Sequence, residues 1–294
     1  MVRAQQVVLI TGASRGLGAA TARELAERGH TVIAGMRRPE QDAAMVCAGY
    51  ESQIEAVRCD ITEPASVEGA VGVALEKHGR IDTLINNAGY GLYGPVEELS
   101  DEEITAQFET NVTGTLRMTR AVLPAMRERG AGRIIMVGSI SSFALAPLSG
   151  MYSASKAALE TASEALRYEV AHWGIEVGIV QPGVYLSGFH DSLARAKRLE
   201  GGESVYQPII DRVVAVHFGV AASRPGPRTI ALTLADAAEI EQPLPLRWPI
   251  GEDARHLLAL RRSLTDSEWE TFLRSGAAGI RSAYFEAARE VGEG

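Results

Sequence analysis

The stretch VVLITGASRGLG, from Val7 to Gly18, runs from an apolar, β-rich pattern directly into three glycines. A segment with helical periodicity follows at once. A glycine-rich turn between a strand and a helix brings backbone N–H groups and the positive end of the helix close to a phosphate. The stretch therefore predicts a phosphate-binding turn, with a tight turn that binds no ligand as the alternative.

The same alternation of short β-rich runs and longer helical patterns continues through the first 180 residues. The strands are expected at 7–10, 31–34, 54–59, 81–86, 133–137 and 175–180, and the longer helices at 16–28, 64–78, 101–129 and 152–173. Such alternation is typical of a parallel sheet with helices on both faces. We therefore expect an α/β fold, a Rossmann-type doubly wound parallel sheet.

The pattern loosens after Pro182. A polar stretch at 187–204 is a candidate lid, and the proline-rich stretch 241–251 contains one possible final strand, LRW, before helices from 252 to about 290. We expect a single domain. Residues 1–185 would form its cofactor-binding and catalytic core, and residues 186–294 its substrate lid and C-terminal extension.

Composition narrows the class of protein. The net charge of the 294 residues is −8, without a basic stripe, so nucleic acid is not an expected partner. No run approaches the roughly 20 apolar residues of a membrane helix. Two cysteines cannot form a disulfide framework and no secretory leader pattern is visible, so a cytoplasmic location is expected. The six histidines lack metal-ligand spacing, so no metal site is expected.

The glycine spacing, G-x-x-x-G-x-G from Gly12 to Gly18, resembles the loop of the short-chain dehydrogenase/reductase family. Further motifs follow in that family's order: Asp60, NNAG at 86–89, Asn111, Ser139, Tyr152 and Lys156. The resemblance is close over about 5–185 and loose beyond. It implies an oxidoreductase that transfers hydride between a nicotinamide dinucleotide and a ketone, an aldehyde or a secondary alcohol.

The choice of cofactor depends on the end of the second expected strand, VIAGMRR. It contains no carboxylate to accept a hydrogen bond from the ribose 2′-OH of NAD, and Met36 stands where NAD-preferring members of the family place Asp. A guanidinium binds phosphate in a fork geometry. Arg37, with Arg15 from the glycine loop, is therefore expected to bind the 2′-phosphate of NADP(H), whereas Arg38 is expected to be a solvated surface charge.

The resemblance also implies the remaining cofactor contacts. Asp60 would lie at the adenine, although an Asp after a strand is also a common turn residue. Ser187 stands where many members have a threonine that binds the nicotinamide carboxamide. The full expected set is Gly12, Ser14, Arg15, Gly16, Leu17, Gly18, Arg37, Asp60, Ile61, Asn87, Ala88, Gly89, Tyr152, Lys156, Pro182, Gly183, Val184 and Ser187.

Tyr152 and Lys156 are four residues apart, which puts both on one face of the expected helix. An ammonium close to a tyrosine favours the phenolate, so Lys156 is expected to lower the pKa of Tyr152. By resemblance, Lys156 also holds the nicotinamide ribose and Tyr152 gives the proton to the developing alkoxide. Ser139 would polarise the carbonyl oxygen, and Asn111 would help to hold a water that links the lysine to solvent.

The substrate pocket is expected to be apolar and partly aromatic. Its expected residues are Ser139, Tyr152, Tyr90, Tyr93, Leu145, Tyr185 and Phe189. They suggest a carbonyl reductase or alcohol dehydrogenase, with hydroxysteroid-like or other bulky hydrophobic carbonyls as one substrate group.

Two other functions remain open at this point. A cofactor-sensing regulator without chemistry would be expected to lose the tyrosine or the lysine, and this chain keeps both. A nucleotide-sugar epimerase or dehydratase would usually have another glycine spacing and a larger C-terminal domain. By analogy with the family, the helices at 101–129 and 152–173 form the interface of a homodimer or homotetramer.

Overall fold

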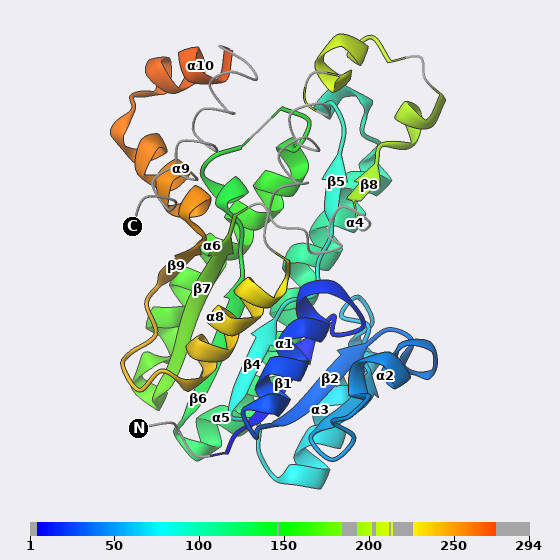
Figure 1. The fold of residues 1–294 in the computed structure, drawn as a ribbon, viewed down its shortest axis with the longest axis vertical. Coiled ribbons are helices and arrows are strands. Elements are labelled where there is room, and N and C mark those ends of the chain that lie inside the picture. The colour runs from blue at the N-terminus through cyan, green and yellow to red at the C-terminus, as the bar shows by residue number, and fades with distance from the viewer. Residues whose placement is uncertain are drawn as a thin grey trace.

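A computed structural model describes residues 5–145, 147–183, 193–201, 204–211, 213 and 226–274. In these residues seven parallel strands form one sheet with the order β3-β2-β1-β4-β6-β7-β9, and helices lie on both of its faces (Figure 1). The expected Rossmann-type doubly wound sheet is confirmed. Four residues of the predicted cofactor and substrate sites lie outside the described residues: Val184, Tyr185, Ser187 and Phe189.

The elements of the N-terminal half follow the expected alternation, with one added helix, α2. Their bounds are β1 Val7–Thr11, α1 Gly16–Glu27, β2 Thr31–Met36, α2 Pro39–Cys47, β3 Ile54–Arg58, α3 Pro64–His78 and β4 Thr83–Asn86.

The middle of the chain carries the elements around the proposed reacting centre. They are β5 Gly91–Tyr93, α4 Asp101–Phe108, a π-helical turn Glu109–Gly114, α5 Thr115–Arg129, β6 Gly132–Val137, α6 Gly150–Val170 and β7 Ile175–Pro182. The C-terminal part contributes β8 Leu193–Arg195, α8 Arg228–Glu239, β9 Arg247–Ile250, α9 Glu252–Ser263 and α10 Asp266–Arg274. The possible final strand is confirmed as β9, which pairs with β7 but begins one residue later than the expected LRW, at Arg247, and extends to Ile250.

Strand β1 shows why the sheet is buried on both sides. Val8 and Ile10 pack on the face covered by α1, α2 and α8, whereas Leu9 packs on the face covered by α3, α5 and α6. Because side chains alternate along a strand, a strand between two helical layers must be apolar at every position. This explains the unbroken apolar run that precedes the glycine loop.

The expected helix at 101–129 is interrupted by the π-helical turn. The Asn111 side chain fills this turn: its Oδ1 accepts from the Tyr90 N–H at 3.1 Å and its Nδ2 donates to the Tyr90 carbonyl at 2.9 Å. At Gly114 an added Cβ would lie 2.8 Å from the Ile61 carbonyl oxygen. A single π-helical turn of this kind is often found at a functional site.

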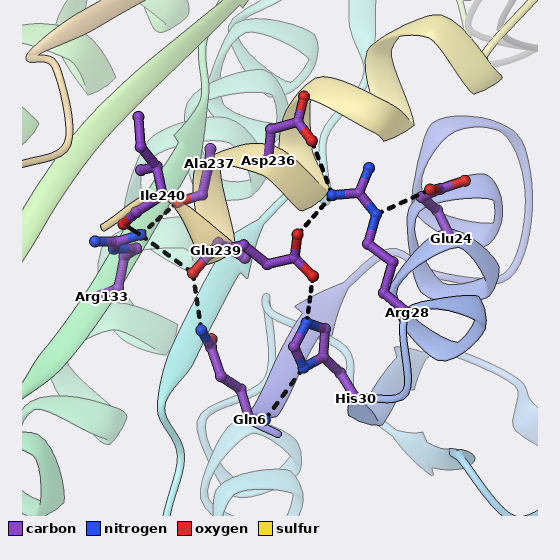
Figure 2. Close-up of polar contacts among 10 residues, drawn as sticks. Gln6, Glu24, Arg28, His30, Arg133, Asp236, Ala237, Glu239 and Ile240 are labelled. Atoms are coloured by element: carbon purple, nitrogen blue, oxygen red, sulfur yellow. Dashed lines mark hydrogen bonds and ion pairs between the residues drawn. The ribbon is translucent and has the colours of Figure 1, made fainter. Parts of the chain in front are cut away.

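Polar contacts attach helix α8 to strand β6 and to the segment between α1 and β2 (Figure 2). Arg133, fully buried in β6, donates through Nη1 to the carbonyls of Ala237, Ala238 and Ile240 at 2.8, 3.1 and 3.0 Å. On the other side, Arg28 and the His30 ring contact Glu239, each at 2.7 Å. A cation at a helix C-terminus satisfies carbonyls that have no partner inside the helix.

Within the described ranges, none of the helices has the length and apolar character needed to cross a bilayer. The division near residue 185 and homo-oligomerisation through α5 and α6 stay predictions.

Candidate active site

The glycine loop between β1 and α1 has the backbone that its sequence predicts. Gly12 and Gly16 adopt φ values of +67° and +57°, a backbone conformation that residues with a Cβ rarely adopt. A Cβ at Gly18 would collide with the Gly12 carbonyl oxygen. The loop therefore folds tightly on itself at the N-terminus of α1, where, among the described residues, no side chain caps the helix.

The NNAG segment holds this loop in place. Asn87 Nδ2 donates to the Thr11 and Gly12 carbonyls at 2.9 and 3.1 Å, and Thr11 Oγ1 accepts from the N–H groups of Asn87 and Ala88 at 3.1 and 3.0 Å. The Asn87 side chain is thus used to shape the loop. Thr11, which directly precedes the first glycine of the loop, was not among the predicted site residues.

The second strand ends at buried Met36, and Arg37 and Arg38 that follow are both exposed. Because parallel β1 and β2 end at the same edge of the sheet, Arg37 lies at the edge that carries the glycine loop and exposed Arg15. This is the edge where doubly wound folds bind their ligands. The structure therefore leaves Arg37 available to a phosphate at that edge.

Asp60 follows β3 and shapes a turn. Its Oδ1 accepts from the Thr62 N–H at 3.0 Å and from Thr62 Oγ1 at 2.7 Å, and its own N–H donates to Ser66 Oγ at 2.9 Å. This is the turn function that the sequence left open beside a cofactor function. Contact of Asp60 with adenine stays a prediction, and Ile61 beside it is buried.

Ser139, Tyr152 and Lys156 come together where β6 ends and α6 begins. A hydrogen bond joins the side chains of Tyr152 and Ser139, and Lys156 Nζ donates to the Val137 carbonyl at 2.7 Å. Ser139 Oγ also accepts from the Ser141 N–H at 3.1 Å. One hydroxyl pair and one amine thus lie at the carboxyl end of a central strand, as the motif spacing predicts.

The net pKa shift of Tyr152 is upward, whereas the sequence predicts a pKa lowered by Lys156. Burial raises the pKa of Tyr152 to about 12, against the smaller lowering effect of the hydrogen bond with Ser139. Burial also lowers the pKa of Lys156 to about 8. Desolvation disfavours the charged form of each group, and it is the largest cause of both shifts.

Asn111 connects the π-helical turn to both neighbouring elements. Besides its two bonds to Tyr90, its Nδ2 donates to Ser155 Oγ at 3.1 Å, and Ser155 Oγ donates to the Tyr152 carbonyl at 2.7 Å. A Cβ at Gly89 would lie 3.0 Å from Asn111 Oδ1 and 3.7 Å from Lys156 Nζ. Asn111 therefore lies close to the Lys156 amine, and its link to a water stays a prediction.

The expected substrate-facing residues are distributed over two segments. Tyr90 precedes β5 and Tyr93 is its last residue; β5 pairs in parallel with β8 in a small second sheet that the sequence did not predict. Leu145 is 47% exposed in the loop between Ser139 and α6. Burial raises the pKa of Tyr93 to about 12, so its phenol is neutral.

Strand β7 ends at Pro182, and Gly183 follows it, beside the end of β6 that precedes Ser139. The Gly183 N–H donates to the Ile250 carbonyl at 3.2 Å, and a Cβ at this glycine would collide with the Asp253 carboxylate. The described residues contain no group of three or more His, Cys, Asp or Glu side chains that could hold a metal ion.

Comparison with known proteins agrees with this geometry. Residues 6–198 match the family model described as short chain dehydrogenase. A 3-ketodihydrosphingosine reductase of Bacteroides thetaiotaomicron is 35% identical over 270 residues, which cover 92% of this chain and 97% of the relative. The chain belongs to the short-chain dehydrogenase/reductase family. The predicted resemblance is confirmed.

Solved structures of similar proteins extend the agreement to the C-terminal region. A short-chain dehydrogenase from Streptomyces avermitilis is 35% identical, covers 94% of this chain and 99% of its own, and superposes with a TM-score of 0.78. A 3-ketoacyl-(acyl-carrier-protein) reductase from Brucella melitensis, in complex with NADH, is 26% identical with a TM-score of 0.69, over 83% of this chain and 96% of its own. This short-chain dehydrogenase/reductase therefore shares its fold with relatives over nearly its full length.

Proposed function

We propose that this short-chain dehydrogenase/reductase transfers hydride between NADP(H) and the carbonyl carbon of a ketone or aldehyde, or the corresponding secondary alcohol. The observation that carries the proposal is the group formed by Ser139, Tyr152 and Lys156 at the end of β6. The group lies at the edge of the sheet where the glycine loop also ends.

The glycine loop fits a dinucleotide. Positive φ at Gly12 and Gly16, and the crowding that any side chain at Gly18 would cause, describe a backbone that a pyrophosphate can approach closely. The exposed backbone of Gly89 lies between this loop and Lys156. When bound, the nicotinamide supplies the hydride.

Tyr152 is suited to give the proton in the reducing direction. With a pKa near 12 its phenol is protonated at neutral pH, which is the form that a general acid needs. The Ser139 hydroxyl, bonded to that phenol, is placed to donate to the same carbonyl oxygen. Lys156, with a pKa near 8, is still protonated at pH 7 and would attract the phenolate that remains after transfer.

Arg37 supports NADP(H) over NAD(H). The exposed guanidinium of Arg37 directly follows Met36, which stands at the position from which an acidic side chain would accept a hydrogen bond from the ribose 2′-OH. Arg37 would bind the 2′-phosphate, with Arg15 approaching from the glycine loop. The Brucella relative is in complex with NADH, so family membership alone does not select NADP(H), and Arg37 is the feature of this chain that supports it.

The names of two relatives suggest the substrate class. The 3-ketodihydrosphingosine reductase and the 3-ketoacyl-(acyl-carrier-protein) reductase are both named for ketones on long or acyl chains. The candidate pocket residues Tyr90, Tyr93 and Leu145 fit an apolar substituent beside the carbonyl. We propose an apolar ketone, with hydroxysteroid-like compounds as the alternative group.

Initial rates with NADPH and NADH over small, aromatic, long-chain and steroid-like ketones test this function. Arg37→Ala should raise the KM for NADPH by about 10- to 100-fold, the effect of losing a hydrogen bond between charged groups, and leave the KM for NADH unchanged. Arg38→Ala is the matched control and should change neither by more than about twofold. Equal KM values for the two cofactors in the wild type would contradict the NADP(H) assignment.

A further inference from the structure

Glu160 is a buried carboxylate on the same helix as Tyr152 and Lys156. It lies one turn beyond the lysine and two turns beyond the tyrosine, so α6 presents all three on one face. Its exposed fraction is 2%. A buried carboxylate is costly unless it is paired and hydrogen-bonded, so its partners indicate what it does.

One oxygen of Glu160 contacts the turn that follows β6. Its Oε1 accepts from Ser142 Oγ at 2.7 Å and lies 3.4 Å from the Ser139 backbone nitrogen, which donates to it. The same Ser142 hydroxyl lies 2.6 Å from the Ser139 carbonyl oxygen, so Ser142 also closes the turn. Glu160 thus contacts the residue whose hydroxyl faces Tyr152.

The sequence leaves room for this approach. Gly138 separates β6 from Ser139, and a Cβ at that position would lie 2.5 Å from Glu160 Oε1. Any side chain there would displace the carboxylate from the turn. Glycine at 138 and glutamate at 160 are therefore coupled by the space between them.

The second oxygen of Glu160 contacts the next two strands of the sheet. Its Oε2 accepts from Gln181 Nε2 at 2.8 Å, and Arg247 Nε lies at 3.4 Å. Gln181 directly precedes Pro182 and Gly183, which the cofactor site is expected to use. Arg247 opens β9 and also pairs with Glu164 at 2.7 Å. A single carboxylate therefore joins the turn after β6, the end of β7 and the start of β9.

We propose that Glu160 is a positioning residue for the hydride transfer described above, which fixes the Ser139 hydroxyl against Tyr152 by holding the 139–142 turn and the end of β7 together. The inference rests on the proposed function. Burial raises the pKa of the Glu160 carboxyl itself, and in its ionised form Glu160 raises the pKa of both Tyr152 and Lys156, which favours their protonated forms.

Kinetics of three variants test the inference, with NADPH and the ketone that the wild type reduces fastest. Glu160→Ala should lower kcat by about 10- to 100-fold, the effect of lost hydrogen bonds to a charged group, and change the KM for NADPH by less than about threefold. Glu160→Gln keeps an acceptor for Ser142 and should retain more of kcat. Glu164→Gln is the matched control: it removes the other carboxylate that pairs with Arg247 and should stay within about twofold of the wild type.

A second background separates positioning from general stabilisation. In Ser139→Ala protein, Glu160→Ala should lower kcat by less than about threefold, because a residue that acts through Ser139 has little left to act on. An equal loss in both backgrounds, or a loss no larger than that of Glu164→Gln, would overturn the inference.

Amide hydrogen exchange supplies a readout that needs no substrate. Exchange in peptides covering residues 138–143 should accelerate in Glu160→Ala and in the milder Ser142→Ala, while peptides from β1 and β4 keep their protection. Unchanged exchange at the turn in both variants would overturn the inference. Absence of NADPH turnover in the wild type would instead count against the proposed function.

Discussion

We expect Lys156 to lower the free energy of unfolding of the protein at neutral pH. Its amine is buried, 6% exposed, and donates to the Val137 carbonyl at 2.7 Å. Burial lowers its pKa from 10.5 to about 8. At 1.36 kcal/mol for each pH unit, this difference corresponds to about 3 kcal/mol for keeping the buried amine charged at pH 7.

The variant Lys156→Met removes the charge and keeps a chain of similar length. It leaves the Val137 carbonyl without this donor, at a cost of about 1–2 kcal/mol. The net expectation is a free energy of unfolding about 1–2 kcal/mol higher than that of the wild type at pH 7. Activity should be lost at the same time, since the amine belongs to the proposed reacting centre.

The pH dependence follows from the lowered pKa. Between about pH 8 and 10.5 the unfolded chain binds more protons at Lys156 than the folded protein does, so the stability of the wild type rises with pH relative to the variant. The destabilisation is fully present below about pH 8. The advantage of Lys156→Met should therefore be largest at pH 7 and disappear by about pH 10.

Urea unfolding followed by tryptophan fluorescence at pH 7, 8.5 and 10 measures this difference. Lys77→Met is the matched control: Lys77 is exposed and pairs with Glu55 at 2.9 Å, so its loss should change stability by no more than about 0.5 kcal/mol at pH 7. A Lys156→Met protein that is less stable than the wild type at pH 7, or whose advantage does not change with pH, would refute the reasoning.

Two further substitutions test the loop and the attachment of α8. Gly18→Ala should weaken NADPH binding at least about tenfold, because the added Cβ collides with the Gly12 backbone. Gly72→Ala, where the added Cβ meets open space, is the control and should leave NADPH binding unchanged. Comparable NADPH binding by the two variants in a fluorescence titration would contradict the loop geometry. Arg133→Met should lower the free energy of unfolding by about 3–5 kcal/mol, because Glu176 and three carbonyls lose their buried partner, whereas Arg274→Met at an exposed pair should cost less than about 0.5 kcal/mol. Denaturant midpoints that do not separate these two arginines would contradict the proposed anchoring of α8.

The sheet and the motif residues were predictable because their signals are local. Each strand of the core is a short apolar run bounded by polar or glycine-rich segments, and even the isolated LRW run overlaps β9. The loop needs positive φ at fixed positions, and glycine, which adopts positive φ readily, stands at those positions in the sequence. The spacing of Tyr152 and Lys156 sets their common helix face.

The features that sequence reasoning missed depend on contacts between distant residues. The π-helical turn at 109–114 exists because Asn111 bonds the backbone of Tyr90, 21 residues earlier. Strands β5 and β8 have three residues each and pair with each other across about 100 residues of sequence, so neither is recognisable from a local pattern. In the sequence, Glu160 cannot be distinguished from an acidic residue on the solvent-facing side of a helix. The direction in which the pKa of Tyr152 shifts depends on its burial, which no local sequence pattern indicates.

The Tyr152→Phe variant tests the central claim most directly. The phenyl ring keeps the packing of α6 and removes the hydroxyl that bonds Ser139. With NADPH and the ketone reduced fastest by the wild type, kcat should fall by about 10²- to 10⁴-fold, the contribution of a positioned general acid. Binding of NADPH, measured by fluorescence titration, should change by less than about threefold. A variant that binds NADPH and keeps more than a tenth of the wild-type kcat would contradict Tyr152 as the proton donor.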